Sequence, residues 1–136
     1  MAETLRLSIV TPQATIFSED VEMVTLPGIE GDMGVYPQHL RLITRVIPGE
    51  LVISQKGQEK FLAVGEGLVE ITHDSVAIVT DMAIPADGID EAKVEEARRR
   101  ATARLEEKIS DEEVASVNAS LAWSLAQLKV KRRHSG

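Results

Sequence analysis

The sequence has no cysteine, few aromatic residues and no long apolar run. Aromatic residues make up 3% of its 136 residues. The absence of cysteine excludes disulfide bonds and thiolate metal sites, and nothing indicates an oxidising compartment. No apolar run approaches the roughly 20 residues that span a bilayer, and the first ten residues do not read as a secretory signal. The length predicts one compact domain, or a small domain with an appendage, around an aliphatic core.

The net charge of −7 is unevenly distributed along the chain. All of the net negative charge lies in residues 1–85, whereas basic and acidic side chains balance in residues 86–136. The acidic first part argues against a nucleic-acid-binding surface there. The basic run KVKRRH, residues 129–134, has no acid between it and Glu113. It complements a helix dipole or binds an acidic protein surface; nucleic acid is the weaker alternative, because no aromatic platform accompanies the run.

Short runs of valine, isoleucine and leucine fill the first 85 residues without helical periodicity. The segment LRLSIVTP alternates between apolar and other residues, and the turn-forming segments QKGQ and THDS separate later runs. Turns about every 8–12 residues favour an antiparallel sandwich. We therefore predict a β-sandwich domain over residues 1–86.

The pattern changes at PADG, residues 85–88, and apolar residues then recur at helical spacing. We predict two helices, at about 89–108 and 111–131, whose short connection makes them antiparallel. Asp90 or Asp87 is expected to cap the first helix. The predicted fold class is α+β, an N-terminal antiparallel β-sandwich followed by a C-terminal antiparallel helical hairpin over residues 87–136.

Ser110 and Glu113 have the spacing of a capping box at the start of the second helix. The residues predicted to face inward are Ile89, Val94, Ala97, Ala101 and Leu105 in the first helix and Val114, Val117, Leu121, Leu125 and Leu128 in the second. These apolar stripes are narrow and accompanied by alanine, so little apolar area is buried. We therefore expect the hairpin to dock weakly on the sandwich.

The segment LPGIEGDMGVYPQH, residues 26–39, contains three glycines at a spacing of three. It matches neither the dinucleotide fingerprint nor the P-loop, and no lysine followed by serine or threonine comes after it. Extended structure is expected after it, so no helix N-terminus is available to a phosphate. Pro27 and Gly28 predict a type II turn. Glu30 and Asp32 are then either solvated turn acids or an acidic contact for a basic partner loop.

The histidines have no metal-like partner at short spacing. They are His39, His73 and His134. No strand-turn-helix elbow frames a serine as a nucleophile. We therefore predict no metal site and no catalytic residue, so the chain is not expected to be an enzyme.

Four stretches together resemble the epsilon subunit of bacterial and chloroplast ATP synthases. They are LPGIEGDMGVYPQH, LRLITRVIPGELVI, AIPADGIDEAKVEEARRRA and ASLAWSLAQLKV, in the order of that family and across nearly the whole chain. Residues 37–42 read Pro-Gln-His-Leu-Arg-Leu where the family usually has Pro-Gly-His-Ala-Pro-Leu. The loss of that glycine and that second proline bears on the exact turn expected there. It does not bear on the resemblance to the family.

The resemblance implies a non-catalytic rotor subunit of the central stalk, which couples rotation of the c-ring to ATP synthesis. Its sandwich would contact the gamma subunit and the c-ring, whose loops typically offer an arginine. Glu30 and Asp32, with His39 just beyond them, are the residues that the resemblance assigns to the c-ring. Such a subunit is peripheral, at the cytoplasmic face of the bacterial inner membrane, and reaches the membrane only through the complex.

The resemblance also makes the hairpin a regulatory element. In that family the folded hairpin rests on the sandwich. The extended hairpin enters the head of alpha and beta subunits and blocks ATP hydrolysis. Acidic segments of the beta subunits would then contact Lys129, Lys131, Arg132 and Arg133.

Some members of that family bind ATP in the folded hairpin through an Ile/Leu-Asp-x-x-Arg-Ala motif. The matching stretch here contains Asp90 and Lys93, and lysine lacks the bidentate fork of arginine. Trp123 and Gln127 stand near positions where ATP binders usually add arginines. We therefore expect no cofactor. The alternative is an ATP-sensing module that uses the helical hairpin, with Asp90 and Lys93 as its nucleotide-binding residues.

Overall fold

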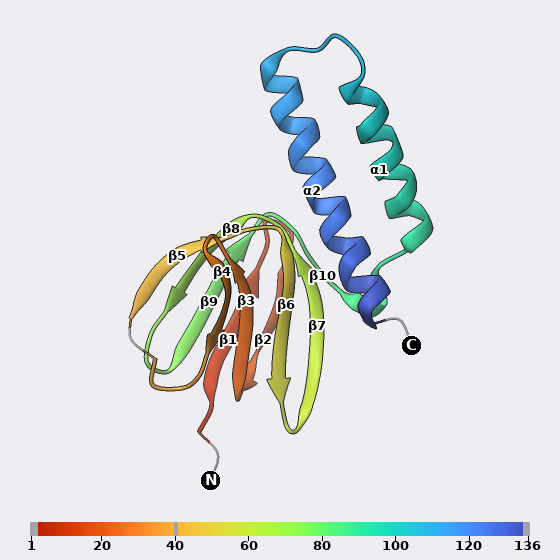
Figure 1. Ribbon diagram of the computed structural model, residues 1–136. Coiled ribbons are helices and arrows are strands. Elements are labelled where there is room, and N and C mark those ends of the chain that lie inside the picture. The colour runs from red at the N-terminus through yellow and green to blue at the C-terminus, as the bar shows by residue number, and fades with distance from the viewer. Residues whose placement is uncertain (1–2, 40, 135–136) are drawn as a thin grey trace.

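The computed structural model describes residues 3–39 and 41–134, so residues 1–2, 40 and 135–136 of the predicted domains lie outside the described residues. Within these described residues, ten strands precede a short 3₁₀ helix and two α-helices (Figure 1). In chain order the strands are β1 Leu5–Val10, β2 Thr15–Val21, β3 Met23–Gly28, β4 Gly31–Val35, β5 Leu42–Val46, β6 Gly49–Gln55, β7 Gln58–Val64, β8 Gly67–Ile71, β9 Ser75–Thr80 and β10 Ala83–Pro85. The predicted sandwich followed by a helical hairpin is confirmed.

The strands form one sheet that folds over its own aliphatic core. Its order is β10-β7-β6-β3-β5-β8-β9-β1-β2, and β4 pairs with β3. Leu5, Leu7 and Ile9 of β1 are buried, whereas the residues between them face outward, as the period of two in a strand requires. Among the described residues, the largest fully buried side chains are leucines, isoleucines and valines from the nine strands β1 to β9, and no aromatic ring is among them.

One pairing differs from the predicted antiparallel arrangement. β1 and β9 are parallel, with Arg6 opposite Ser75 and Val10 opposite Val79. A parallel pair needs a long connection between its strands. Here most of the sandwich lies between β1 and β9 in sequence, so no local pattern indicates the pairing.

The predicted type II turn at Pro27 and Gly28 is wrong. Both residues belong to β3, where Pro27 lies opposite Asp32 and Gly28 opposite Gly31. The chain reverses after them, and Gly31 takes the positive φ of 120°. A Cβ atom on Gly28 would come within 2.9 Å of the Gly31 carbonyl oxygen. Gly28 therefore permits a close approach between two strands.

The hairpin consists of α1, Glu91–Leu105, and α2, Asp111–His134, after the 3₁₀ helix η1, Ala86–Gly88. Asp90 caps α1, because its Oδ1 accepts a hydrogen bond from the backbone N–H of Lys93 at 3.2 Å. The capping box of α2 is also confirmed: Ser110 Oγ accepts from the Glu113 N–H at 3.2 Å, and Glu113 Oε1 accepts from the Ser110 N–H at 3.4 Å. The Ser110 N–H is the main reason that the pKa of Glu113 is lowered.

Replacing Ser110 with alanine is expected to lower the free energy of unfolding of the hairpin by about 1 kcal/mol, the usual loss for an N-cap serine. Urea titration of the full chain, followed by helical circular dichroism, measures the change. The matched control is Ser116→Ala, an exposed serine within α2, which removes the same hydroxyl without removing a cap. An equal loss in both variants would contradict the role of the capping box.

The predicted inward face of α2 is partly wrong. Leu125 is 50% exposed. The buried residues of α2 are Ser124, Ala126, Gln127, Leu128 and Val130. They occupy more than one side of the helix, because α2 contacts both α1 and the β6–β7 edge of the sandwich.

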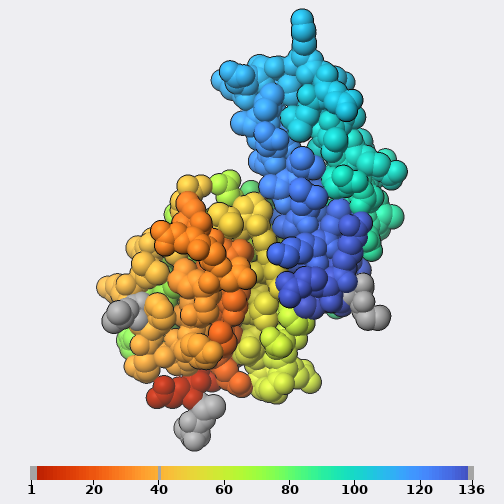
Figure 2. Space-filling view, viewed as in Figure 1, coloured from red at the N-terminus to blue at the C-terminus, as the bar shows by residue number. Residues whose placement is uncertain are grey.

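In the part of the chain that the structure describes, the buried residues of the hairpin lie near its base. Val94 is the buried residue of α1, and the buried residues of α2 all lie in its second half. They join a small apolar cluster that is separate from the sandwich core: Ala63, Ile89, Val94, Leu128 and Val130, with Phe61, Ile84, Ala86 and Trp123 packed against it. The distal turns project beyond the sandwich (Figures 1 and 2).

Candidate functional site

The turn between β3 and β4 presents two carboxylates. Glu30 lies in the turn and Asp32 follows it in β4, and both side chains are exposed. Neither carboxylate has a hydrogen bond or ion pair within the described residues. The neighbouring Ile29 is 57% exposed. This tip therefore offers negative charge beside an apolar side chain, which suits a cationic partner.

His39 lies away from these acids. The adjacent Gln38 donates its backbone N–H to the carbonyl oxygen of His73 at 2.6 Å, in the turn after β8. The acids lie at the opposite end of the sheet, where β3 ends and β8 begins. The strand β4 separates the two places by roughly 15 Å, at about 3.3 Å per residue. The structure thus brings Glu30 and Asp32 together but not His39.

The last turns of α2 carry the predicted basic residues: Lys129, Lys131, Arg132 and Arg133. Arg132 is engaged with α1, because its Nε lies 2.7 Å from Glu91 Oε1 and its Nη2 lies 2.9 Å from Glu95 Oε2. Within the described part of the chain, the two lysines make no such contact. The basic end therefore consists of two unpaired lysines and of arginines bound within the molecule.

These ion pairs favour the charged forms of their members. A hydrogen bond from Arg98 is the main reason that the pKa of Glu95 is lowered, and Arg132 adds to the effect while partial loss of water opposes it. The hydrogen bond to Glu91 is the main reason that the pKa of Arg132 is raised. Because the Arg132 and Glu91 side chains are 57% and 43% exposed, their attraction is modest and screened by salt.

Arg133 and His134 connect α2 to the sandwich through Glu50 of β6. Arg133 Nη1 lies 3.0 Å from Glu50 Oε1, and His134 Nε2 lies 2.6 Å from Glu50 Oε2. The His134 ring stacks on Phe61 of β7 with the centroids 3.5 Å apart and the planes at 9°. Sequence reasoning gave no role to Glu50 or Phe61, and it included His134 only in the basic run and among histidines without a metal-like partner. Its one relevant signal was the basic run, which indicated an acidic surface but not one in the same chain.

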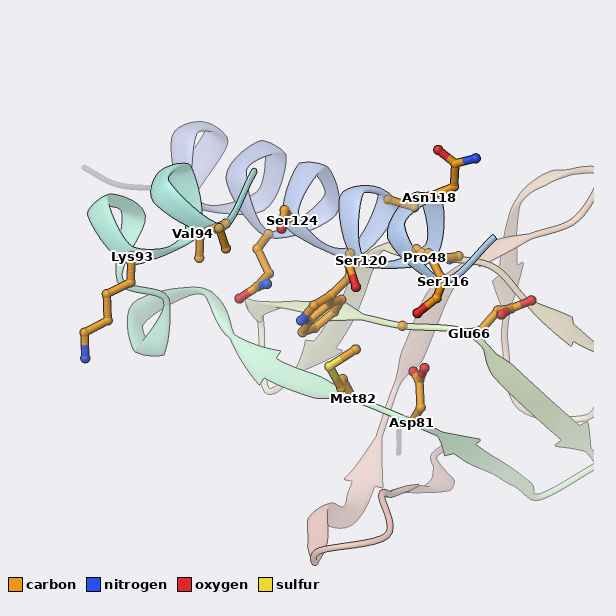
Figure 3. Close-up of a pocket in the computed structure, with 16 residues that line it drawn as sticks. Pro48, Glu66, Asp81, Met82, Lys93, Val94, Ser116, Asn118, Ser120 and Ser124 are labelled. Atoms are coloured by element: carbon orange, nitrogen blue, oxygen red, sulfur yellow. The ribbon is translucent and has the colours of Figure 1, made fainter. Parts of the chain in front are cut away.

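A cleft of about 810 Å³ lies between the hairpin and the edge of the sandwich. Lys93 stands at one end, and its side chain extends away from Glu66 and Asp81 at the other end (Figure 3). Trp123 and Gln127 also line the cleft. The structure therefore brings Lys93, Trp123 and Gln127 to one cleft, whereas Asp90 is not among the residues that line it.

The chemistry of this cleft does not suit a polyphosphate. Lys93 is its one cation, and it is accompanied by the carboxylates of Glu66 and Asp81 among the lining residues. Asp90 already uses its carboxylate to cap α1. A triphosphate needs several cationic or N–H donors, and carboxylates would repel it.

The outer face of the sheet carries an exposed apolar strip that sequence reasoning missed. Leu68 of β8 lies opposite Val79 of β9, which lies opposite Val10 of β1. Their exposed fractions are 55%, 60% and 36%. Ile43 of β5 is also exposed, on a strand that pairs with β8. A row of exposed apolar residues on a rigid sheet is typical of a protein–protein contact.

Among residues 3–39 and 41–134, no group of three or more histidine, cysteine, aspartate or glutamate side chains could hold a metal ion. No helix of that part is both long enough and apolar enough to cross a membrane.

Comparison with known proteins identifies both parts of the chain. Residues 4–86 match the family model described as the beta-sandwich domain of the ATP synthase Delta/Epsilon chain, and residues 87–132 match its long alpha-helix domain. The ATP synthase epsilon chain of Laribacter hongkongensis is 39% identical over 128 residues, which cover 93% of this chain and 91% of the relative. That of Herminiimonas arsenicoxydans is 39% identical over 135 residues, with 98% and 96% covered.

Two solved structures share the fold. A chain of the Euglena gracilis mitochondrial ATP synthase, in a structure of OSCP, F1 and the c-ring, has a TM-score of 0.75 at 23% identity and covers 96% of this chain and 82% of its own. A chain of the central stalk and c-ring structure from Tetrahymena thermophila has a TM-score of 0.65 at 13% identity, with 93% and 96% covered. At these identities the structures show the fold alone. With both domain models and the curated relatives matched, the chain belongs to the ATP synthase epsilon-chain family.

Proposed function

We propose that the chain is a non-catalytic rotor subunit in the central stalk of a proton-translocating ATP synthase. In this role it couples rotation of the c-ring to ATP synthesis in the alpha–beta head. The observation that carries the proposal is the combination of a rigid sandwich, with its exposed apolar strip, and a hairpin that docks through a small separate cluster. Family membership supports the same role. The chain would reach the cytoplasmic face of a bacterial membrane only through the complex.

The apolar strip is the proposed contact for the gamma subunit. It consists of Val10, Ile43, Leu68 and Val79 on the outer face of the sheet. A strip on β1, β5, β8 and β9 does not conflict with the hairpin, which docks at β6 and β7. Gamma could therefore hold the sandwich whether or not the hairpin is docked.

Replacing both Leu68 and Val79 with aspartate is expected to weaken gamma binding by more than about 2 kcal/mol, because two carboxylates would be buried without partners. The measurement is co-purification of alpha, beta and gamma with a tagged chain. Leu125→Asp is the matched control, because Leu125 is similarly exposed but lies on α2. If the tagged wild-type chain captures no subunit, the rotor proposal fails. If the strip variant captures gamma as well as the wild-type chain does, the strip is the wrong surface.

The hairpin is the proposed inhibitory element. Released from the sandwich, α2 would insert its basic end into the head, where Lys129, Lys131, Arg132 and Arg133 would contact acidic segments of the beta subunits. The small cluster that joins the hairpin to the sandwich supports such a release. Glu30 and Asp32, at the turn between β3 and β4, are the proposed contact for an arginine of the c-ring loops.

The alternative function is ATP sensing by the hairpin, with Asp90 and Lys93 as binding residues. The cleft beside Lys93 has the size of a ligand pocket. The carboxylates of Glu66 and Asp81 in this cleft would repel a polyphosphate. They therefore favour the rotor role without bound nucleotide. Calorimetry of the full chain with Mg-ATP separates the two hypotheses: we expect no binding below about 1 mM, or about −4 kcal/mol. Tighter binding would favour the sensor.

A further inference from the structure

All ion pairs between α2 and the sandwich in the described residues end on one carboxylate, that of Glu50. We propose that Glu50 is a charge latch that keeps the hairpin docked. It holds Arg133 and His134 at the same time, one on each carboxylate oxygen. Release of the hairpin then requires both contacts to break together.

The position of Glu50 strengthens these contacts. Its side chain is only 11% exposed, and α2 packs against its strand, β6. Hydrogen bonds between charged partners strengthen where water is excluded. The His134 ring also lies flat on Phe61, which fixes the imidazole against the carboxylate. A carboxylate left without both donors would have to regain water, which happens only if α2 moves away.

The apolar part of the docking contact is too small to dominate it. Within the described chain, the sandwich supplies Ala63 as the buried member of the docking cluster, with Phe61 and Ile84 partly buried. The other members belong to the hairpin and its connection. At about 25 cal/mol per Å² such a surface contributes little. The charged contacts at Glu50 therefore decide whether the hairpin stays docked.

This latch has a consequence for the inhibitory role, and that step rests on the proposed function. Arg133 is bound to Glu50 in the docked hairpin, so it is unavailable to another acidic surface. Lys129 and Lys131 are unpaired within the described residues and remain available. An acidic partner would first meet the lysines and would then compete with Glu50 for Arg133.

Thiol labelling of the isolated full chain tests the latch without reference to the complex. The chain has no cysteine, so Val130→Cys introduces a single thiol at a position that is fully buried in the docking cluster. The thiol reacts only when the hairpin opens, so the labelling rate measures the opening equilibrium even if the open state is rare. Circular dichroism checks that each variant is folded.

Glu50→Gln in this background is expected to raise the labelling rate at least about tenfold, because charge-assisted hydrogen bonds to a mostly buried group are lost. The matched control is Glu66→Gln, which breaks the exposed 3.0 Å ion pair between Glu66 and Arg45, two residues of the sandwich, and should leave the rate within about twofold. Raising the salt concentration should speed labelling when Glu50 is present but not in Glu50→Gln.

The double change Arg133→Gln with His134→Gln gives the decisive comparison. If Glu50 acts through these two partners, Glu50→Gln adds nothing further in that background. Equal effects of Glu50→Gln with and without the partners would overturn the latch, and so would an unchanged rate in the folded Glu50→Gln chain. Neither result bears on whether the complex is inhibited, so failure of the latch and failure of the proposed function are distinguishable.

Discussion

Deleting residues 87–136 is expected to raise the rate of ATP hydrolysis by the synthase, while its subunits still assemble. The cut falls after β10, which still pairs with β7 through Ala83 and Ile84, so the sandwich keeps its sheet and its apolar strip. If the inserted hairpin is favoured over the docked hairpin by about 1.4 kcal/mol, its removal raises the hydrolysis rate roughly tenfold. The measurement compares hydrolysis by purified complexes that contain the full or the shortened chain.

A milder variant tests whether the basic end carries the effect. Changing Lys129, Lys131, Arg132 and Arg133 to glutamine keeps α2 but removes its cations, and hydrolysis should rise in the same direction. The control is Arg99→Gln with Arg100→Gln, which removes exposed cations of α1 and should leave the rate unchanged. Unchanged hydrolysis in the deletion variant, with normal subunit content, would count against inhibition by this hairpin.

Features that depend on neighbours in sequence were predicted well. The alternation of β1 and the capping box at Ser110 both follow from spacings of two and three residues. The break at residues 85–88 likewise separates two different periodicities. By contrast, the dipeptide of Pro27 and Gly28 fits a turn locally, but pairing with β4 extends it into a strand.

Features set by distant segments were not predictable. The parallel pairing of β1 with β9 depends on how the whole sheet closes. Leu125 fits the apolar stripe of an isolated hairpin, but contact with the sandwich shifts the buried side of α2. Glu50 and His134 are 84 residues apart, and each has an ordinary sequence context. The acidic tip was predictable because Glu30 and Asp32 lie on either side of Gly31, close together in sequence.

Charge reversal at the tip, Glu30→Lys with Asp32→Lys, is expected to weaken the coupling of proton pumping to ATP hydrolysis. Each exposed carboxylate facing an arginine contributes up to about 1 kcal/mol. Replacing both attractions by repulsion therefore changes the contact by roughly 2–4 kcal/mol, or at least about thirtyfold in affinity. The assay compares ATP-driven proton pumping with ATP hydrolysis in membrane vesicles, and the defect should shrink as salt screens the charges.

Two controls separate a local contact from a general charge effect. Glu3→Lys with Glu59→Lys makes the same change in net charge at exposed positions away from the tip, and it should leave coupling intact. His39→Gln should also leave coupling intact, because His39 lies at the other end of β4 from the acids. Full coupling in the tip variant would contradict the proposed c-ring contact. A loss with His39→Gln instead would move that contact to the opposite end of the sandwich.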